Sequence, residues 1–303
     1  MTTETKKAHW AVLGANLLFG INFSVVKFVS PEFVKPFGLN FIRVSTAVLL
    51  FWLLYLLKPL KAGIDKKDIP RFILCAISGI AINQLMFIKG MTLTTPIHGA
   101  LLILVTPVFI LLIAFAFRSE SITWLKLLGL LLGIGGASLL ILSKETSGIG
   151  SNMLLGDLLV TVNAISYAFY FILVKPLMKK YAPLHVIRWV FTFGFLIITP
   201  FCFGEFLEID WHTFQLAQYA GVFFIVIGAT FFTYLFTVYG LQHLSPSAAG
   251  SYIYLQPVFS AIVSTLFFNE VLSVSKLIAA ALIFTGVYLV NRKNANAGVA
   301  IEE

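Results

Sequence analysis

Amide and phenol side chains interrupt several long apolar runs in this sequence of 303 residues. Asn and Gln can orient a small polar group through hydrogen bonds, and Tyr rings can hold an apolar or planar body. Within the run 155–175, Asn163, Tyr167 and Tyr170 are three or four residues apart, so a helix would present them on one face. The candidate substrate-binding residues are Asn16, Asn22, Asn83, Gln84, Asn163, Tyr167, Tyr170, Tyr234, Tyr252, Tyr254 and Gln256. Hydrogen bonding between packed helices is the alternative role for each residue, but the set favours the lining of a cavity.

Charged side chains are scarce inside these runs. Arg43 and Arg188 lie near the starts of the runs 38–57 and 184–204, peripheral to the amide and phenol set. They could attract an anionic group or form contacts in a gate. No Asp or Glu lies at the centre of a run, so the carboxylate that a proton relay normally uses is missing.

Signatures of enzymes and metal sites are missing from the sequence. It has no ATP-binding Walker loop and no paired-histidine metalloprotease motif, and Cys75 and Cys202 lack metal-ligand spacing. We therefore expect no catalytic residues, no metal and no cofactor. An intramembrane enzyme that uses Ser or His chemistry is a less favoured alternative.

The composition indicates a membrane protein. Hydrophobic residues make up 59% of the chain and charged residues 11%, whereas about a quarter of a soluble domain is charged. Lipid must therefore cover most of the surface. The formal net charge of +8 is better explained by positively charged cytoplasmic loops than by nucleic-acid binding. The expected partners are the lipid bilayer and a small-molecule substrate, and the sequence leaves open whether the protein is a monomer or a homodimer.

Ten apolar runs are long enough to span a bilayer as helices, at about 20 residues each, and too long for barrel strands of about 10 residues. They cover residues 9–29, 38–57, 69–90, 95–117, 122–142, 155–175, 184–204, 214–240, 246–268 and 273–291. If the N-terminus is cytoplasmic, most of the 21 Lys and Arg residues fall on the cytoplasmic side. This bias predicts a multi-pass protein of the cytoplasmic membrane with both termini cytoplasmic.

An internal repeat divides the chain. A shift of 150 positions superposes Gly90 on Gly240, Pro96 on Pro246, Pro107 on Pro257 and Glu120 on Glu270. Each half contains five runs, an odd number, so the second half must enter the membrane from the opposite side. The sequence predicts an all-α membrane protein of ten transmembrane helices as two inverted five-helix repeats, 1–145 and 146–303, which together form one transport domain. The matched Pro107 and Pro257 are candidate kinks or hinges, and the glycines near Gly129 and Gly133 favour close helix packing within the chain.

The repeated motifs resemble the drug/metabolite transporter superfamily, specifically its EamA-type ten-helix members. In the first half the pattern includes residues 17–23, Arg43, and 107–109; in the second it includes residues 245–249 and 256–259. Phe19 departs from the tryptophan that is common in the family, and Arg118-Ser119 replaces the glycine that commonly precedes Glu120. The resemblance implies a secondary carrier whose central cavity is formed mainly by the first, third, fourth, sixth, eighth and ninth helices.

The favoured hypothesis is a secondary transporter that exports small amphipathic metabolites, such as amino acids, by alternating access. The first alternative is a carrier for anionic or nucleotide-linked metabolites, which would need several basic groups in the cavity. The amide and phenol set, with Arg43 and Arg188 at its periphery, favours the small amphipathic metabolite.

Overall fold

Helices account for all the regular secondary structure in the part of the chain that the structure, a computed structural model, describes. The described residues are 3–57, 63–93, 102–104, 106–117, 123–142, 153–268 and 274–291. The repeat residues Pro96, Glu120 and Glu270 lie outside these ranges.

The helices of the first half follow the apolar runs closely. They are α1 (Thr3–Val29), α2 (Pro36–Leu57), α3 (Ile69–Ala76), η1 (Ile77–Ile82), α4 (Asn83–Leu93), α6 (Thr106–Ala116) and α7 (Trp124–Leu142). The segment η1 is a π-helix, and it joins α3 to α4 as one continuous helical rod.

The second half has the same kinds of element. They are α8 (Met153–Lys180), α9 (Pro183–Leu207), η2 (Trp211–Thr213), α10 (Leu216–Phe223), η3 (Phe224–Phe232), α11 (Thr233–His243), α12 (Pro246–Gly250), η4 (Ser251–Leu255), α13 (Gln256–Phe268) and α14 (Val274–Asn291). The π-helix η3 joins α10 to α11, and the 3₁₀ segment η4 separates α12 from α13.

Six helical rods among the described residues are long and apolar enough to cross a membrane. They cover Thr3–Val26, Pro36–Leu57, Ile69–Leu93, Leu154–Lys180, Pro183–Leu207 and Leu216–His243. The shorter helices α6, α7, α13 and α14 correspond to the remaining apolar runs. For these four helices, membrane crossing stays a prediction.

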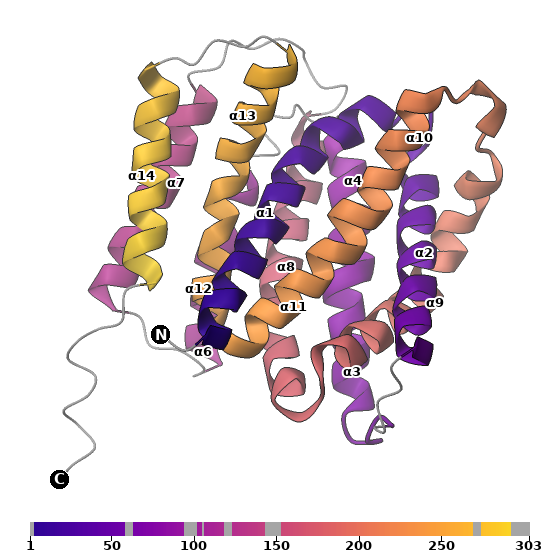
Figure 1. Cartoon of the computed structure of the whole chain (residues 1–303), viewed down its shortest axis with the longest axis horizontal. Helices are drawn as coiled ribbons and strands as arrows, with labels where there is room; N and C mark the ends of the chain where they lie inside the picture. The colour runs from indigo at the N-terminus through magenta and orange to yellow at the C-terminus, as the bar shows by residue number, and fades with distance from the viewer. Residues whose placement is uncertain are drawn as a thin grey trace.

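The rods pack as pairs drawn from the two halves of the chain. Helix α1 packs on α11, α4 on α8, and α2 on α9. In Figure 1, α14 and α7 lie side by side at one edge of the molecule, away from α2 and α9 at the other. The largest apolar core lies among α2, α3, α8, α9 and α11.

Glycines allow the α7–α14 pair to approach closely. A Cβ added at Gly129 would lie 2.7 Å from the carbonyl oxygen of Gly286, and one added at Gly286 would lie 2.6 Å from that of Gly129. No side chain fits in such a space, because real Cβ contacts are longer. Gly133 faces the ring of Tyr254 in the same region. The expectation that Gly129 and Gly133 serve packing within the chain is confirmed.

Candidate functional site

A pocket lies where helices of both halves meet, and the space between its lining atoms, open solvent included, is about 540 Å³. Helices α1, α2, α4 and α6 contribute to it from the first half, and α8, α11, η4 and α13 from the second. The lining residues are Phe19, Asn22, Phe23, Arg43, Asn83, Gln84, Phe87, Ile103, Thr106, Asn163, Tyr167, Tyr234, Ile253 and Gln256. Polar groups and aromatic walls in one pocket are typical of a site for a small organic molecule.

The two π-helices bring polar side chains to the pocket. Asn83 and Gln84 follow η1 directly, and Tyr234 is the second residue after η3. A π-helix displaces the residues that follow it relative to a regular α-helix, and such bulges are frequent at functional sites. It also changes the hydrogen-bond pattern of the backbone, so its carbonyl groups need other donors.

Side chains of α8 and of η3 itself supply such donors. Asn163 Nδ2 donates to the carbonyl oxygen of Asn83 at 2.7 Å, and Ser166 Oγ donates to that of Ser78 at 2.6 Å. In η3 the hydroxyl of Thr230 donates to the carbonyl of Ile225 at 2.8 Å. Asn163 therefore has a structural task as well as a place in the pocket lining.

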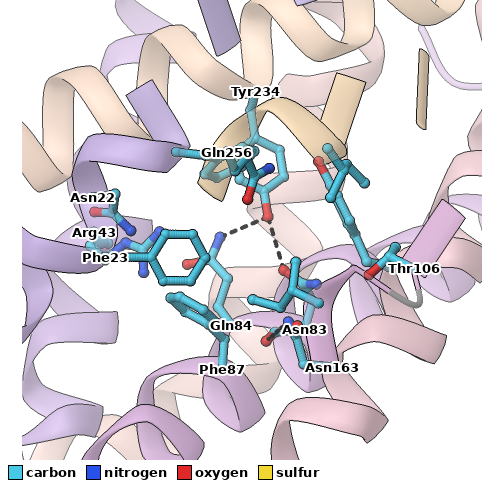
Figure 2. A pocket seen from close by; sticks show the side chains of 14 residues that line it. Asn22, Phe23, Arg43, Asn83, Gln84, Phe87, Thr106, Asn163, Tyr234 and Gln256 are labelled. Atoms are coloured by element: carbon cyan, nitrogen blue, oxygen red, sulfur yellow. Dashed lines mark hydrogen bonds between the residues drawn. The ribbon is translucent and has the colours of Figure 1, made fainter. Parts of the chain in front are cut away.

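Tyr234 connects the two halves at the pocket. Its hydroxyl oxygen accepts a hydrogen bond from Gln84 Nε2 at 3.2 Å and donates to the carbonyl of Gly79 at 2.8 Å. The same oxygen lies 3.4 Å from Asn83 Oδ1, and Figure 2 shows the hydroxyl between Gln84 and Asn83. These bonds fix the tyrosine ring against α4.

Arg43 is the one Lys or Arg side chain in the described part of the pocket lining, and only 3% of its surface is exposed. Its Nε donates to Thr230 Oγ1 at 2.9 Å. Its Nη1 is buried with no hydrogen-bond partner in the described part of the chain. The sequence analysis placed this residue at the periphery, whereas the structure places it beside Asn22 and Phe23 at one side of the pocket (Figure 2).

Four of the eleven candidate binding residues do not line this pocket. Asn16 lies behind it, where its Oδ1 accepts a hydrogen bond from Gln256 Nε2 at 2.8 Å. Tyr170 packs against Gly79. Tyr252 lies 2.7 Å from His9 Nδ1 through its hydroxyl, and Tyr254 packs on α7. The other seven are brought together in the pocket.

Arg188 also lies away from the pocket, at the start of α9. It is 2% exposed, and its guanidinium carbon lies 3.6 Å from the ring centroid of Tyr55 and 4.6 Å from that of Trp52.

Pro107 and Pro257 are each the second residue of a helix, α6 and α13, so their missing N–H groups cost no helical hydrogen bond. A segment that is not α-helical precedes Pro257.

Sequence reasoning missed the apolar part of the lining. Phe19 and Phe23 are four residues apart on α1 and flank Asn22, and Phe87 follows Gln84 by three residues on α4. Residues three or four positions apart lie on one face of a helix, so the distance of these phenylalanines from the amides could have predicted their place in the lining. Ile103, Thr106 and Ile253 come from segments next to interruptions of helix, where spacing gives no guide.

Comparisons with known proteins show the family of the chain. The family model described as the EamA-like transporter family matches residues 6–142 and 154–292. A protein of Archaeoglobus fulgidus named "Uncharacterized transporter" is 25% identical over 285 residues, covering 94% of this chain and 99% of that protein. A protein of Streptantibioticus cattleyicolor named "Probable terminal-alkyne amino-acid exporter" is 24% identical over 227 residues, covering 75% of this chain and 74% of that protein.

A solved structure titled only "Crystal structure of protein" has a TM-score of 0.77 with this chain at 16% identity. The superposition covers 94% of this chain and 96% of that one. It therefore supports the helical fold over nearly the whole chain.

Proposed function

Because the chain belongs to the EamA-like transporter family, we propose that it is a secondary transporter that exports small amphipathic metabolites, such as amino acids, by alternating access. The observation that carries the proposal is the pocket between helices of the two halves, with amides and phenols beside phenylalanine rings. A site at such a junction can open to either side of a membrane if the halves move relative to each other.

The pattern of helix packing supports two inverted five-helix repeats, 1–145 and 146–303. In the two halves, α1 corresponds to α8, α4 to α11, α2 to α9 and α7 to α14. The α1–α11 pair therefore has the α8–α4 pair as its counterpart, and the α2–α9 and α7–α14 pairs each join two corresponding helices. The two π-helices occupy corresponding rods, and Gln84 hydrogen-bonds to Tyr234, its own counterpart at the 150-residue offset. Counterparts that touch each other lie next to a local twofold axis. The same symmetry supports ten transmembrane helices. The distribution of Lys and Arg along the chain supports a multi-pass protein of the cytoplasmic membrane with both termini cytoplasmic.

The pocket lining supports an amphipathic cargo. Phe19, Phe23 and Phe87 can contact an apolar body, while Asn22 and Gln84 can orient a polar head. The relative named as an amino-acid exporter supports the same class of compound. Arg43 favours a cargo with a negatively charged group, but one Lys or Arg among the described lining residues is too few for a nucleotide-linked or multiply phosphorylated solute.

Transport by the purified protein in proteoliposomes tests the proposal. We expect saturable, protein-dependent flux of at least one compound from a panel of amino acids and small carboxylates and amines. Two variants with the same new side chain provide the comparison. Ile103→Trp places an indole in the pocket and should abolish flux, whereas Leu49→Trp alters an exposed leucine on α2 and should not.

Absence of saturable flux for the whole panel, under imposed proton and membrane-potential gradients, would contradict the proposed function. Equal flux in the Ile103→Trp and wild-type proteins would show that the solute takes another route. Both variants must first elute as monodisperse species in detergent, which separates a blocked pocket from a misfolded protein.

A further inference from the structure

Arg43 holds a buried positive charge that has no anionic partner among the described residues. Among the described residues it forms no salt bridge; the salt bridges that these residues do form lie at exposed helix ends, such as Lys180–Asp68 and Lys35–Glu208. An unpaired charge removed from water is costly and is normally compensated by a counterion or by several hydrogen bonds. Thr230 satisfies one N–H group of Arg43, and Nη1 has no partner in the described part of the chain. The guanidinium is therefore prepared for an anionic group that arrives from outside the protein.

Two acceptors of the same pocket are equally unpaired. Asn22 Oδ1 and Gln84 Oε1 are buried without a hydrogen-bond donor in the described part of the chain. A carboxylate has no proton to give them, so they need a second group that donates. An ammonium group supplies three donors and is attracted by amide oxygens.

The rest of the lining sets the shape of the remaining part of the solute. The rings of Phe23 and Phe87 meet edge to face with centroids 5.6 Å apart, and Phe19 meets Tyr167 in the same manner at 6.5 Å. These rings form an apolar surface next to the polar groups of Asn22 and Gln84. An aromatic or aliphatic body fits this surface, because aromatic walls gain from contact with another apolar group.

The single guanidinium also limits the charge of the solute. A phosphate ester carries close to two negative charges, and sites for such groups normally gather several basic side chains or backbone N–H groups. Arg43 can bind one carboxylate through a two-pronged pair of hydrogen bonds. The match in charge is therefore to a monocarboxylate.

We infer that Arg43 is the carboxylate-binding residue of the pocket and that Asn22 and Gln84 receive a neighbouring ammonium group. The solute class is an α-amino acid with an apolar side chain that rests on Phe19, Phe23 and Phe87. This inference rests on the proposed function, of which it names the substrate class and the residues that select it. It makes Arg43 the residue that selects for a carboxylate. The other buried arginine, Arg188, serves as its control.

Four probes with a common phenyl body separate the contributions of the head groups. L-Phenylalanine has both charges, L-phenylalaninamide lacks the carboxylate, 3-phenylpropionate lacks the ammonium, and phenyl phosphate replaces both with a phosphate. Dissociation constants are measured for the purified protein in detergent by calorimetric titration, which does not require transport. We expect L-phenylalanine to bind roughly tenfold to a hundredfold more tightly than L-phenylalaninamide, since a charged hydrogen-bonded pair is lost.

Substitutions assign these preferences to residues. Arg43→Gln should bring L-phenylalanine and L-phenylalaninamide to within about twofold of each other, and Arg43→Lys should keep part of the difference because it keeps the charge. Asn22→Leu, of similar size, should reduce only the preference for L-phenylalanine over 3-phenylpropionate. Arg188→Gln removes the same charge outside the pocket and should change neither ratio. Lys180→Gln, which removes an exposed charge, provides a second control that leaves the buried core untouched.

The outcomes distinguish this inference from the proposed function. Phenyl phosphate as the tightest probe, a carboxylate preference that survives Arg43→Gln, or no binding of either carboxylate probe by the wild-type protein at about 10 mM would overturn the inference. Binding with the expected ratios but without flux in proteoliposomes would overturn the transporter proposal and leave the inference standing. If Arg43→Gln does not fold, the wild-type ratios and the Arg43→Lys variant still decide the question.

Discussion

The two buried arginines, Arg43 on α2 and Arg188 on α9, show how the surroundings of one residue type decide its role. Each is at most 3% exposed, and neither forms a salt bridge within the described residues. Helices α2 and α9 pack on each other, so both arginines belong to a single helix pair. Nevertheless, Arg43 lines the pocket and Arg188 does not.

The difference lies in what compensates the charge. The guanidinium carbon of Arg188 lies within 6 Å of the ring centroids of Tyr55, Trp52 and Trp189, which we call the aromatic cage. Its Nη2 also donates to His185 Nδ1 at 3.0 Å, whereas its Nε and Nη1, like Nη1 of Arg43, are buried with no hydrogen-bond partner in the described part of the chain. A ring face attracts a cation, and the attraction grows when water is excluded. No such ring contact is made by Arg43 among the described residues, so its charge remains open to a ligand.

The comparison therefore assigns a structural role to one arginine and a binding role to the other. In membrane interiors a charged side chain is costly, so it normally faces the protein interior or a cavity and is compensated by polar or charged partners. Substitutions around Arg188 should alter stability without altering ligand preference. Substitutions around Arg43 should alter both, or ligand preference alone.

Loss of a cage ring should give the largest change in stability. Trp52→Ala removes a ring that stacks near Arg188, packs against Trp189 and donates to Thr192 Oγ1 at 3.0 Å. We expect a loss of about 3 kcal/mol or more in the free energy of unfolding, from the cavity together with the uncovered cation. Reversible unfolding in mixed detergent micelles measures it.

Trp52→Phe is the matched control for this prediction. It keeps a ring beside Arg188 and removes the hydrogen bond to Thr192, so about 1 kcal/mol should be lost. Equal losses in the two variants would mean that the hydrogen bond, and not the ring face, supports the cage. A changed ratio of L-phenylalanine to L-phenylalaninamide binding in either variant would break the division of roles.

A smaller loss in the free energy of unfolding is expected when the hydrogen-bond acceptor of Arg43 is removed. Thr230→Val, nearly the same in shape, leaves Arg43 Nε without its acceptor and should cost about 2 kcal/mol. It should also weaken L-phenylalanine binding, because the guanidinium is no longer held in one orientation. Titration calorimetry and unfolding are measured on the same preparation.

The corresponding change at the cage is Thr192→Val. It removes the acceptor of Trp52 Nε1, a neutral donor, so the loss should be nearer 1 kcal/mol, and ligand binding should not change. Weaker ligand binding in Thr192→Val than in Thr230→Val would contradict the assignment of the two arginines.

The sequence predicted the pocket unevenly, on regular and on interrupted helices alike. On the continuous helices α1 and α8, Asn22, Asn163 and Tyr167 line the pocket. Asn16 and Tyr170 lie on the same two helices and do not line it. Tyr252 and Tyr254 were grouped with Gln256, but they lie on the 3₁₀ segment η4. Because a 3₁₀-helix has three residues per turn instead of 3.6, these side chains point to different neighbours.

The fold was predicted in the same uneven way. Hydropathy gives the helices and their approximate limits, because each run must cross an apolar layer. It gives neither π-helix, since the carbonyl of Ser78 in η1 accepts from Ser166 on another helix, and that of Ile225 in η3 accepts from the Thr230 hydroxyl. Arg43 was assigned to the periphery from its distance along the run, and its place beside the pocket depends on how α2 packs against η3.

Two buried tyrosines test whether the hydrogen-bonded network at the pocket differs from ordinary core packing. Tyr234→Phe removes the bonds to Gln84 and to the Gly79 carbonyl and should cost about 1 kcal/mol. The hydroxyl of Tyr170 is buried without a partner in the described part of the chain, so Tyr170→Phe should be neutral or slightly stabilising. Thermal unfolding of both variants measures the two changes in stability. A larger loss of stability for Tyr170→Phe than for Tyr234→Phe would contradict the prediction.

The smallest change in stability is expected when a cation that has carboxylate partners is replaced. At an exposed helix end, Lys180 Nζ lies 2.6 Å from Asp68 Oδ2 and 3.0 Å from Asp65 Oδ2. The hydrogen bond from Lys180, followed by that from the Tyr181 hydroxyl, lowers the pKa of the Asp68 carboxyl. The hydrogen bond from Lys180 likewise lowers the pKa of Asp65.

The sign of the pH dependence follows from these lowered pKa values. A carboxyl whose pKa is lower in the folded than in the unfolded state stabilises the protein above the unfolded value, near 3.9. That contribution is lost as the pH falls through the folded pKa of Asp68. The unfolding temperature of the wild type should therefore fall between pH 5 and pH 3 by more than that of Asp68→Asn, and Lys180→Gln should flatten the profile similarly. The two buried arginines stay charged throughout this range. An acid-induced loss that persists in both variants, but disappears in Trp52→Ala, would place the titrating group in the cage and overturn the contrast between paired surface cations and unpaired buried ones.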